Sequence, residues 1–282
     1  MIGPNTLATC DCPDGPPVLI PLIDGLPLPH MKIIDLSLPL EDSPSEPLRV
    51  TVEHQSHSDT AAVMAGYFGA TVDDLPEKLG WANELITACS HNGTHVDAPY
   101  HYFPTCAGKP ARTIDELPLE WFFSDGVVLD FSSKQNGALI EPQDIEQELV
   151  RINYQLKPFD IVMIRTDADR FWGSVEYFHA GAGVSAAATR FLIEAGIRVM
   201  GIDAWGWDQP FWAMKERFLA TKDPSVIWEA HRVGRDLEYC QIEKLAKLSM
   251  LPRPFGFKVS CFPVKLKGGS AGWSRVVALF DT

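Results

Sequence analysis

Three histidines and one aspartate lie close together between residues 91 and 101. His91, His95 and Asp97 supply two imidazole nitrogens and a carboxylate oxygen, a donor set that Zn²⁺ or Mn²⁺ accepts with coordination positions left open. A glycine between the two histidines and the following Asp-Ala-Pro sequence disfavour a helix, so we expect a loop to present these ligands. Open coordination positions permit catalysis, and the stretch therefore predicts a catalytic metal site.

His101 follows the three expected ligands and is not needed to hold the ion. The intrinsic pKa of an imidazole is near neutral, so this side chain can take a proton from a water molecule at the site. We therefore expect His101 to act as the general base. A hydrogen-bonded loop without metal is the alternative for such a cluster, and the Gly-Thr and Asp-Ala-Pro-x-His elements disfavour it.

The spacing His-x-Gly-Thr-His-x-Asp-x-Pro-x-His resembles the signature of the cyclase-like metal-dependent hydrolases, which include kynurenine formamidase, isatin hydrolase and trans-dienelactone hydrolase. Three further segments resemble strands of that family, at residues 34–37, 160–166 and 201–203. The resemblance covers roughly residues 32 to 280. It implies an α/β fold of the swivelling β/α/β type, with a central mixed, barrel-like sheet and peripheral helices.

The resemblance also implies a second metal position, formed by His231 and Glu243 with Asp97 as a bridge. Two ordinary alternatives remain open, because Glu243 could pair with Lys247 along a helix and His231 could cap a helix end. Glu238 is a rival carboxylate if one helix runs through this segment. The cofactor is thus expected to be zinc or manganese, with one or two ions per chain.

Tryptophans are abundant and concentrate in the segments around residues 172, 205–212 and 228. Large aromatic side chains are commonly core residues, but as a group that follows an expected strand they favour a pocket for a flat or cyclic substrate. The segment from about 205 to 228 is longer and more aromatic than in the short formamidases. The candidate substrate-binding residues are Trp172, Trp205, Trp207, Phe211 and Trp212.

Composition excludes several kinds of partner. The net charge of −13 argues against nucleic acid and anionic membranes, which both require a basic protein surface. No apolar run is long enough to span a bilayer, and no basic residue precedes Lys32, so we expect a cytoplasmic protein without a secretory signal. Six scattered cysteines favour reduced thiols, and the Cys10-x-Cys12 pair alone is a weak metal motif.

Residues 1–30 are rich in proline and glycine and predict an irregular arm, whereas residues 31–282 predict a single domain. A strand, helix and strand over residues 159–204 form a crossover unit, which indicates a partly parallel sheet. Strands are predicted near residues 32–38, 49–54, 84–90, 126–132, 159–165, 198–204, 257–264 and 275–280. Helices are predicted near residues 142–153, 185–195, 209–220, 223–232 and 237–248.

We therefore expect a metal-dependent hydrolase that opens a small cyclic amide, imide, lactone or diketone. One alternative is an arylformamidase that acts on an N-formyl aromatic amine. Another is a member of the fold that binds metal or ligand without catalysis. The family resemblance further implies a homodimer or homotetramer.

Overall fold

The computed structural model describes residues 7–10, 18–21 and 31–281, and the chain divides into two units. One unit comprises residues 1–32 with 281–282, and it holds the antiparallel strands β1 (Leu7–Cys10) and β2 (Val18–Pro21). An irregular arm was expected here, but these β-prone runs between the prolines form strands. The rest of the expected arm and Cys12 lie outside the described residues.

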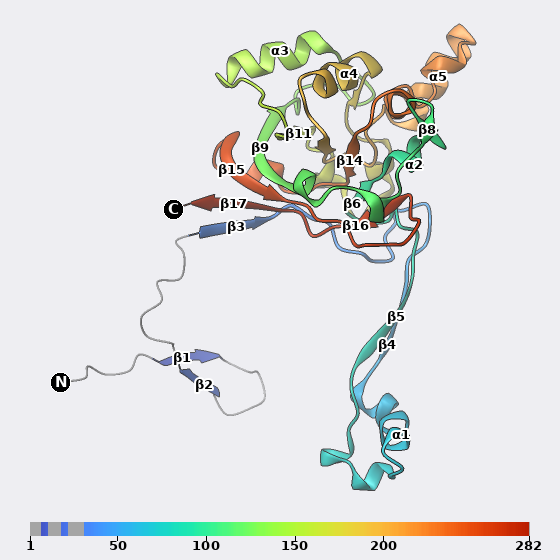
Figure 1. Ribbon diagram of the computed structural model, residues 1–282, viewed down its shortest axis with the longest axis vertical. Coiled ribbons are helices and arrows are strands. Elements are labelled where there is room, and N and C mark those ends of the chain that lie inside the picture. The colour runs from blue at the N-terminus through green and yellow to red at the C-terminus, as the bar shows by residue number, and fades with distance from the viewer. Residues whose placement is uncertain (1–6, 11–17, 22–30, 282) are drawn as a thin grey trace, which may run out of the picture. The chain divides into compact units, whose positions relative to one another are not determined.

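The other unit, residues 33–280, is built on a curled, mixed sheet of nine strands in the order β16-β6-β14-β13-β11-β9-β15-β17-β3 (Figure 1). Strands β9, β11, β13 and β14 are parallel, and β6, β15, β16 and β17 pair antiparallel with their neighbours. The α/β class with a mixed, barrel-like sheet is thereby confirmed. The strand bounds are β3 Met31–Asp35, β6 His95–Asp97, β9 Phe123–Asp130, β11 Ile161–Arg165, β13 Val199–Ile202, β14 Cys240–Glu243, β15 Phe255–Ser260, β16 Ala271–Trp273 and β17 Val277–Asp281.

Both faces of this sheet are apolar. Along β11, Val162 and Ile164 pack toward the helices, whereas Ile161 and Met163 face a second core inside the curl, as the two-residue period of a strand requires. Helices α3 and α4 lie side by side over the outer face (Figure 1). The helix bounds are α1 His57–Tyr67, α2 Pro99–Tyr102, α3 Pro142–Arg151, α4 Ala186–Glu194 and α5 Phe211–Thr221.

Short elements connect these layers. Three further strand pairs are β4 (Thr51–Gln55) with β5 (Asn83–Thr87), β7 (Thr105–Cys106) with β8 (Lys109–Pro110), and β10 (Leu139–Ile140) with β12 (Gly183–Val184). The 3₁₀ turns are η1 Val72–Asp74, η2 Pro76–Lys78, η3 Ile114–Glu116, η4 Leu119–Phe122, η5 Ala168–Phe171, η6 Val175–His179, η7 Pro224–Val226, η8 His231–Arg235 and η9 Leu248–Met250.

Two expected helices were wrong. Residues 223–232 form the turns η7 and η8, and residues 237–248 contain the buried strand β14. This strand pairs with β13 on one side and β6 on the other, and its alternating polar residues Gln241 and Glu243 interrupt the apolar run typical of a buried strand. The expected loop over residues 91–101 likewise contains β6 and the short helix α2.

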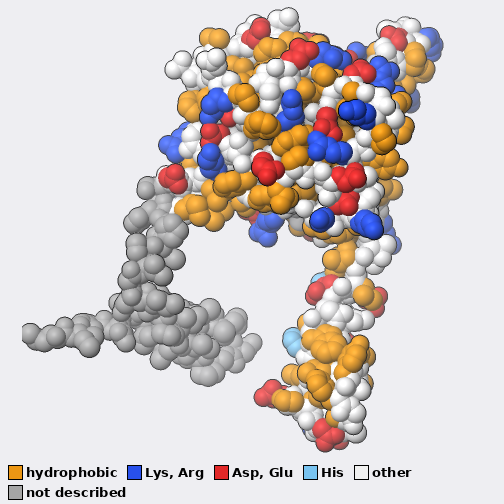
Figure 2. Space-filling view, in the orientation of Figure 1, with side chains coloured by type: hydrophobic (Ala, Val, Ile, Leu, Met, Phe, Trp, Pro, Cys, Tyr) orange, Lys and Arg blue, Asp and Glu red, His pale blue; other side chains and the backbone are white. Residues whose placement is uncertain are grey.

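The β4–β5 ribbon leads to α1, and this region has a small core of its own around Ala61, Ala65 and Leu75. Hydrophobic side chains gather on its surface (Figure 2), where Tyr67 is 77% exposed and Phe68 is 72% exposed. A lone two-stranded ribbon is marginally stable in water, so these surfaces are candidates for contact with another chain. In the described part of the chain, no helix is long and apolar enough to cross a membrane.

Candidate active site

Strand β6 and the turn before it bring three donor atoms together. His91 Nδ1 lies 2.9 Å from Asp97 Oδ1, and His95 Nε2 lies 3.2 Å from the same oxygen. The two imidazole nitrogens are 3.3 Å apart. Donors bound at about 2.0–2.1 Å to one tetrahedral ion are separated by about 3.3 Å. The three expected ligands therefore have the spacing that one cation requires.

Asp97 is fully buried, and neither of its carboxylate oxygens accepts a hydrogen bond of normal geometry from the described residues. Burial raises the pKa of a carboxyl group, but electrostatic interactions with His101, His91 and His95 outweigh burial and hold the pKa of Asp97 well below its usual range. A buried, ionised carboxylate without hydrogen-bond donors is costly. The residues thus fit a divalent cation, which would satisfy both oxygens.

The imidazoles are oriented by bonds from their other nitrogens. His95 Nδ1–H donates to the Gly93 carbonyl at 2.9 Å, and His91 Nε2 lies 3.0 Å from Ser270 Oγ. This leaves Nδ1 of His91 and Nε2 of His95 to face Asp97, as metal-binding histidines require. Burial favours the neutral ring of His91, but the charge of Asp97 outweighs it and raises the pKa of His91.

His231 and Glu243 adjoin the same carboxylate. His231 Nε2 lies 3.5 Å from Glu243 Oε1 and 3.8 Å from Asp97 Oδ2. The antiparallel register of β14 and β6 places Glu243 opposite His95, 3.7 Å apart between Oε2 and Nε2. Asp97 therefore lies between two donor sets, the arrangement expected if it bridges two ions. The rival carboxylate Glu238 lies elsewhere, in an ion pair with an arginine.

Asp208, which no sequence motif indicated, orients His231. Its Oδ2 lies 2.5 Å from His231 Nδ1. Burial lowers the pKa of His231, but the bond to Asp208 and the nearby carboxylates raise it to about 9. A carboxylate on the far nitrogen of a histidine is typical of metal ligands. No spacing in the sequence links these two residues, which a loop of the fold brings together.

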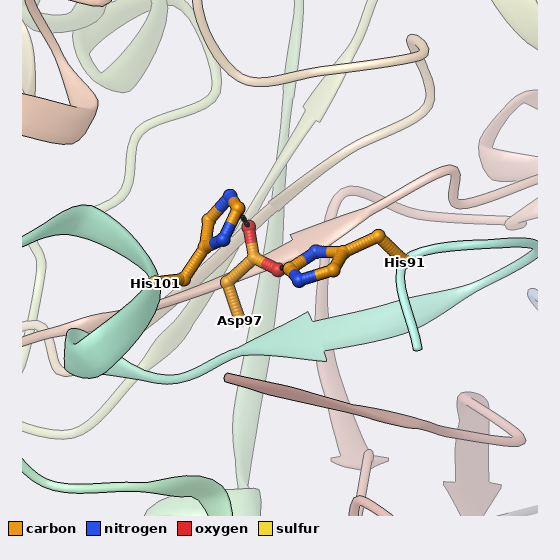
Figure 3. A group of neighbouring side chains, drawn as sticks. All are labelled: His91, Asp97 and His101. Atoms are coloured by element: carbon orange, nitrogen blue, oxygen red, sulfur yellow. Dashed lines mark ion pairs between the residues drawn. The ribbon is translucent and has the colours of Figure 1, made fainter. Parts of the chain in front are cut away.

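His101, on α2, completes the cluster. Figure 3 shows the Asp97 carboxylate between the rings of His91 and His101, and His101 Nε2 lies 3.9 Å from Asp97 Oδ2. Burial and the neighbouring histidines outweigh the opposing effect of Asp97 and lower the pKa of His101 to about 3. The ring is therefore neutral near pH 7, which is the protonation state that a general base requires. Its distance from His91 and Asp97 would also permit a ligand role.

A buried ion pair supports the ligand turn. Lys244 Nζ lies 2.8 Å and 2.9 Å from the two carboxylate oxygens of Glu46 and donates to the His91 carbonyl at 2.7 Å. Glu46 Oε1 also accepts the Gly93 N–H at 2.7 Å. Both charged side chains are only 2% exposed. This ion pair was not predicted from the sequence. It joins the turn before β6 to the residue after Glu243.

A cavity of about 100 Å³ opens above these donors. Its floor contains His91, His101, His231 and Glu243. Phe178 and Trp205 make an edge-to-face contact at 4.7 Å, and the Trp228 indole stacks on His231 at 4.5 Å. The apolar walls are formed mainly by Phe178, Trp205, Phe211, Met214 and Trp228. The arrangement can hold a flat apolar group beside a cluster of metal ligands.

Of the aromatic candidates, Trp205 and Phe211 line this cavity, and Trp172, Trp207 and Trp212 are not among its lining residues. Trp207 was expected to bind substrate, but it is fully buried in the core and donates its indole N–H to Thr189. Strand β13 ends at Ile202, so strand alternation does not carry Trp205 and Trp207 to one side. Trp172 donates to Glu41, and Trp212 donates to the His179 carbonyl.

Sequence comparisons identify related proteins. A family model described as "Putative cyclase" matches residues 34–209. Kynurenine formamidase of Salinibacter ruber is 25% identical over 198 residues, which are 67% of this chain and 75% of that protein. Kynurenine formamidase of Bacillus mycoides is 25% identical over 123 residues, or 42% of this chain, and the chain spans about half (49%) of that relative's length.

Solved structures share the fold. Isatin hydrolase A from Labrenzia aggregata, bound to benzyl benzoate, superposes with a TM-score of 0.70 at 24% identity, over 90% of this chain and 95% of that one. Isatin hydrolase A from Ralstonia solanacearum gives a TM-score of 0.69 at 21% identity, over 89% and 92% of the two chains. Since the family model matches more than half of its residues, this chain belongs to the cyclase family.

Proposed function

We propose that this protein is a metal-dependent hydrolase that opens a small cyclic amide, imide, lactone or diketone. The observation that carries the proposal is the buried Asp97 carboxylate, which lacks hydrogen-bond partners in the described structure and faces the free nitrogens of His91 and His95. The aromatic cavity above this cluster supports a flat or cyclic substrate. The similarity to kynurenine formamidases and isatin hydrolases supports hydrolysis as the reaction class.

Different side chains would bind the metal and transfer the proton. Zinc or manganese held by His91, His95 and Asp97 would supply Lewis acidity to a substrate carbonyl and to the attacking water. His101 Nε2 accepts the proton that the water loses as its oxygen bonds to the carbonyl carbon. In an amide or lactone, the ring C–N or C–O bond then breaks, and His101 returns the proton to the departing atom. The products are a carboxylic acid and an amine or alcohol within one molecule.

We place one tightly bound ion at His91, His95 and Asp97, and a second at His231 and Glu243 when both positions fill. Elemental analysis after dialysis measures the stoichiometry. If the wild type binds two ions per chain, we expect Glu243→Gln to lower the number of bound ions and to leave the first ion in place. If the wild type binds one ion, the variant should bind one as well. Loss of all metal from this variant would contradict the division into two positions.

The decisive experiment for the function is a hydrolysis screen of the purified, metal-reconstituted chain. Lactams, imides, lactones and isatin are each incubated with the protein, and ring opening is followed as a mass gain of one water. We expect turnover of at least one of these cyclic classes, and chelation of the metal should abolish it. Turnover that survives complete metal removal would contradict the mechanism.

Two alternatives are decided when N-formylkynurenine is added to the same screen. An arylformamidase is favoured by the similarity to kynurenine formamidases, and activity on N-formylkynurenine that equals or exceeds the best cyclic substrate would establish it. A protein that binds metal but hydrolyses none of these compounds would be a non-catalytic member of the fold.

We also infer a homodimer or homotetramer that acts on a small molecule in the cytoplasm. The exposed aromatic residues Tyr67 and Phe68 on the α1 region support self-association. The free thiols of Cys89, Cys106, Cys240 and Cys261 accord with a reducing compartment. Light scattering of the wild type and of Phe68→Asp tests the assembly. A monomeric wild type would contradict it.

A further inference from the structure

Helix α5 carries an apolar stripe that runs from the exposed Phe211 past the buried Met214 to the partly exposed Phe218. Phe211, Met214, Lys215 and Phe218 recur at the spacing of one helical face, and Lys215 is the only polar member. With the segment Ile227–Trp228, these residues line a groove of about 410 Å³. Phe211 and Ile227 are each 42% exposed there. A contiguous, open apolar surface of this kind marks a binding site.

The groove adjoins the catalytic cavity, because Phe211, Met214 and Trp228 line both. The catalytic cavity itself holds only about 100 Å³, whereas small-molecule sites occupy roughly 300–1,000 Å³. It has room for the reacting group and little else. The remainder of a larger substrate would therefore extend past these shared residues into the groove of about 410 Å³.

Trp228 is held firmly at the junction. Its backbone adopts φ +56°, a left-handed conformation that is costly for a residue with a bulky side chain. Its N–H donates to Met214 Sδ at 3.3 Å, and its ring is stacked on His231 with an interplanar angle of 6°. The surrounding structure thus maintains an indole that contacts both compartments, as expected at a boundary between two parts of one ligand site.

We propose that this groove binds a neutral alkyl or aryl substituent of the substrate, so that the preferred substrates are cyclic amides or lactones with an extended apolar chain. This inference rests on the proposed hydrolase function and adds the class of substrate. The groove walls are apolar apart from Lys215, so binding there depends on buried area and rises with substituent length.

The test is a series of isatins whose ring nitrogen carries a linear alkyl chain of one to eight carbons. We expect kcat/KM to increase by up to about fourfold for each methylene that becomes buried, until the chain passes Phe218. Phe218→Asp should remove this dependence on length. Leu219→Asp is the matched control, because Leu219 lies on α5, is 52% exposed and does not line the groove, and it should retain the wild-type dependence.

A binding experiment separates the groove from the catalytic proposal. Calorimetric titration with 4-alkylbenzoates of increasing chain length requires no turnover, and Ile227→Asp on the opposite wall replaces Phe218→Asp if the latter does not fold. Affinity that rises with length in the wild type and Leu219→Asp, but not in the groove variants, supports the groove even if no substrate is hydrolysed. Affinity and kcat/KM that do not depend on chain length would overturn the proposed binding groove. The proposal is also overturned if a groove variant dissociates an oligomer into monomers but keeps the wild-type dependence on chain length.

Discussion

Two clusters of potential metal ligands differ in how their carboxylates are satisfied. One is His95, Asp97 and Glu243, and the other is Asp167, Asp169 and Asp203. In both, the ligand atoms lie close enough together for one ion. Yet Asp97 accepts no hydrogen bond of normal geometry, whereas Asp203 accepts several from the chain that follows β11.

The second cluster is a structural turn. Asp203 accepts the Thr166 N–H at 2.8 Å, the Thr166 hydroxyl at 2.6 Å and the Asp167 N–H at 2.9 Å, so it ties the end of β13 to the end of β11. Arg165 pairs with Asp167, and Asp169 accepts the Lys247 N–H. Burial raises the pKa of Asp203 to about 7. Carboxylate oxygens that lack hydrogen bonds, rather than the number of acidic residues, therefore distinguish the candidate metal site from a structural turn.

The largest expected effect comes from Asp97→Asn. This substitution keeps the shape of the side chain but removes the charge shared by both donor sets. We expect metal affinity to fall by more than the roughly 10–100-fold that loss of a supporting partner costs, and hydrolysis to fall below detection. Competition with a fluorescent chelator measures the affinity, and unchanged binding in this variant would show that the ion lies elsewhere.

His101→Ala should separate catalysis from metal binding. We expect turnover to fall on the order of 10²–10⁴-fold, the usual contribution of a general base, with the tightly bound ion retained. Turnover and metal content are measured on the same preparation. Full activity would remove His101 from the mechanism, and loss of the ion would make it a ligand instead.

The next prediction compares the contribution of the buried ion pair Glu46–Lys244 to stability with that of a more exposed ion pair. Lys244→Met leaves Glu46 charged and buried, so we expect the free energy of unfolding to fall by about 3–5 kcal/mol in urea denaturation. The double variant with Glu46→Gln should lose less than the sum of the single variants. The half-buried pair Arg112–Glu238 is the control, and Arg112→Met should cost about 1 kcal/mol or less. Equal losses at the two pairs would contradict a special role for the buried one.

The smallest effect is expected in the second cluster. Asp169→Asn changes a carboxylate that accepts a backbone hydrogen bond, so we expect metal affinity and turnover within twofold of the wild type. The same chelator competition used for Asp97→Asn measures it. A loss comparable to that of Asp97→Asn would make the two clusters equivalent and break the comparison.

Much of the fold and of the candidate site could be predicted from residues that are close together in the sequence. His91, His95 and Asp97 could be found because they are neighbours in the chain, and α4 could be found from the capping Ser185, whose hydroxyl accepts the Ala188 N–H. The mixed sheet followed from the strand, helix and strand pattern that includes α4.

Contacts between distant residues could not be predicted. Glu46 and Lys244 are 198 positions apart, and only the closure of the sheet joins them. The strand β14 was interpreted as helix because its polar Gln241 and Glu243 hide the apolar character of a buried strand. The aromatic walls were only partly identified, since the chain leaves strand geometry after Ile202 and directs Trp207 into the core.

The central claim is tested most directly by anomalous diffraction from crystals grown with Mn²⁺ or Zn²⁺. We predict a strong anomalous peak within bonding distance of His91 Nδ1, His95 Nε2 and Asp97, and no peak at the turn that contains Asp203. A peak at that turn with none beside Asp97, or no peak at either cluster in a chain that hydrolyses its substrate, would contradict the account.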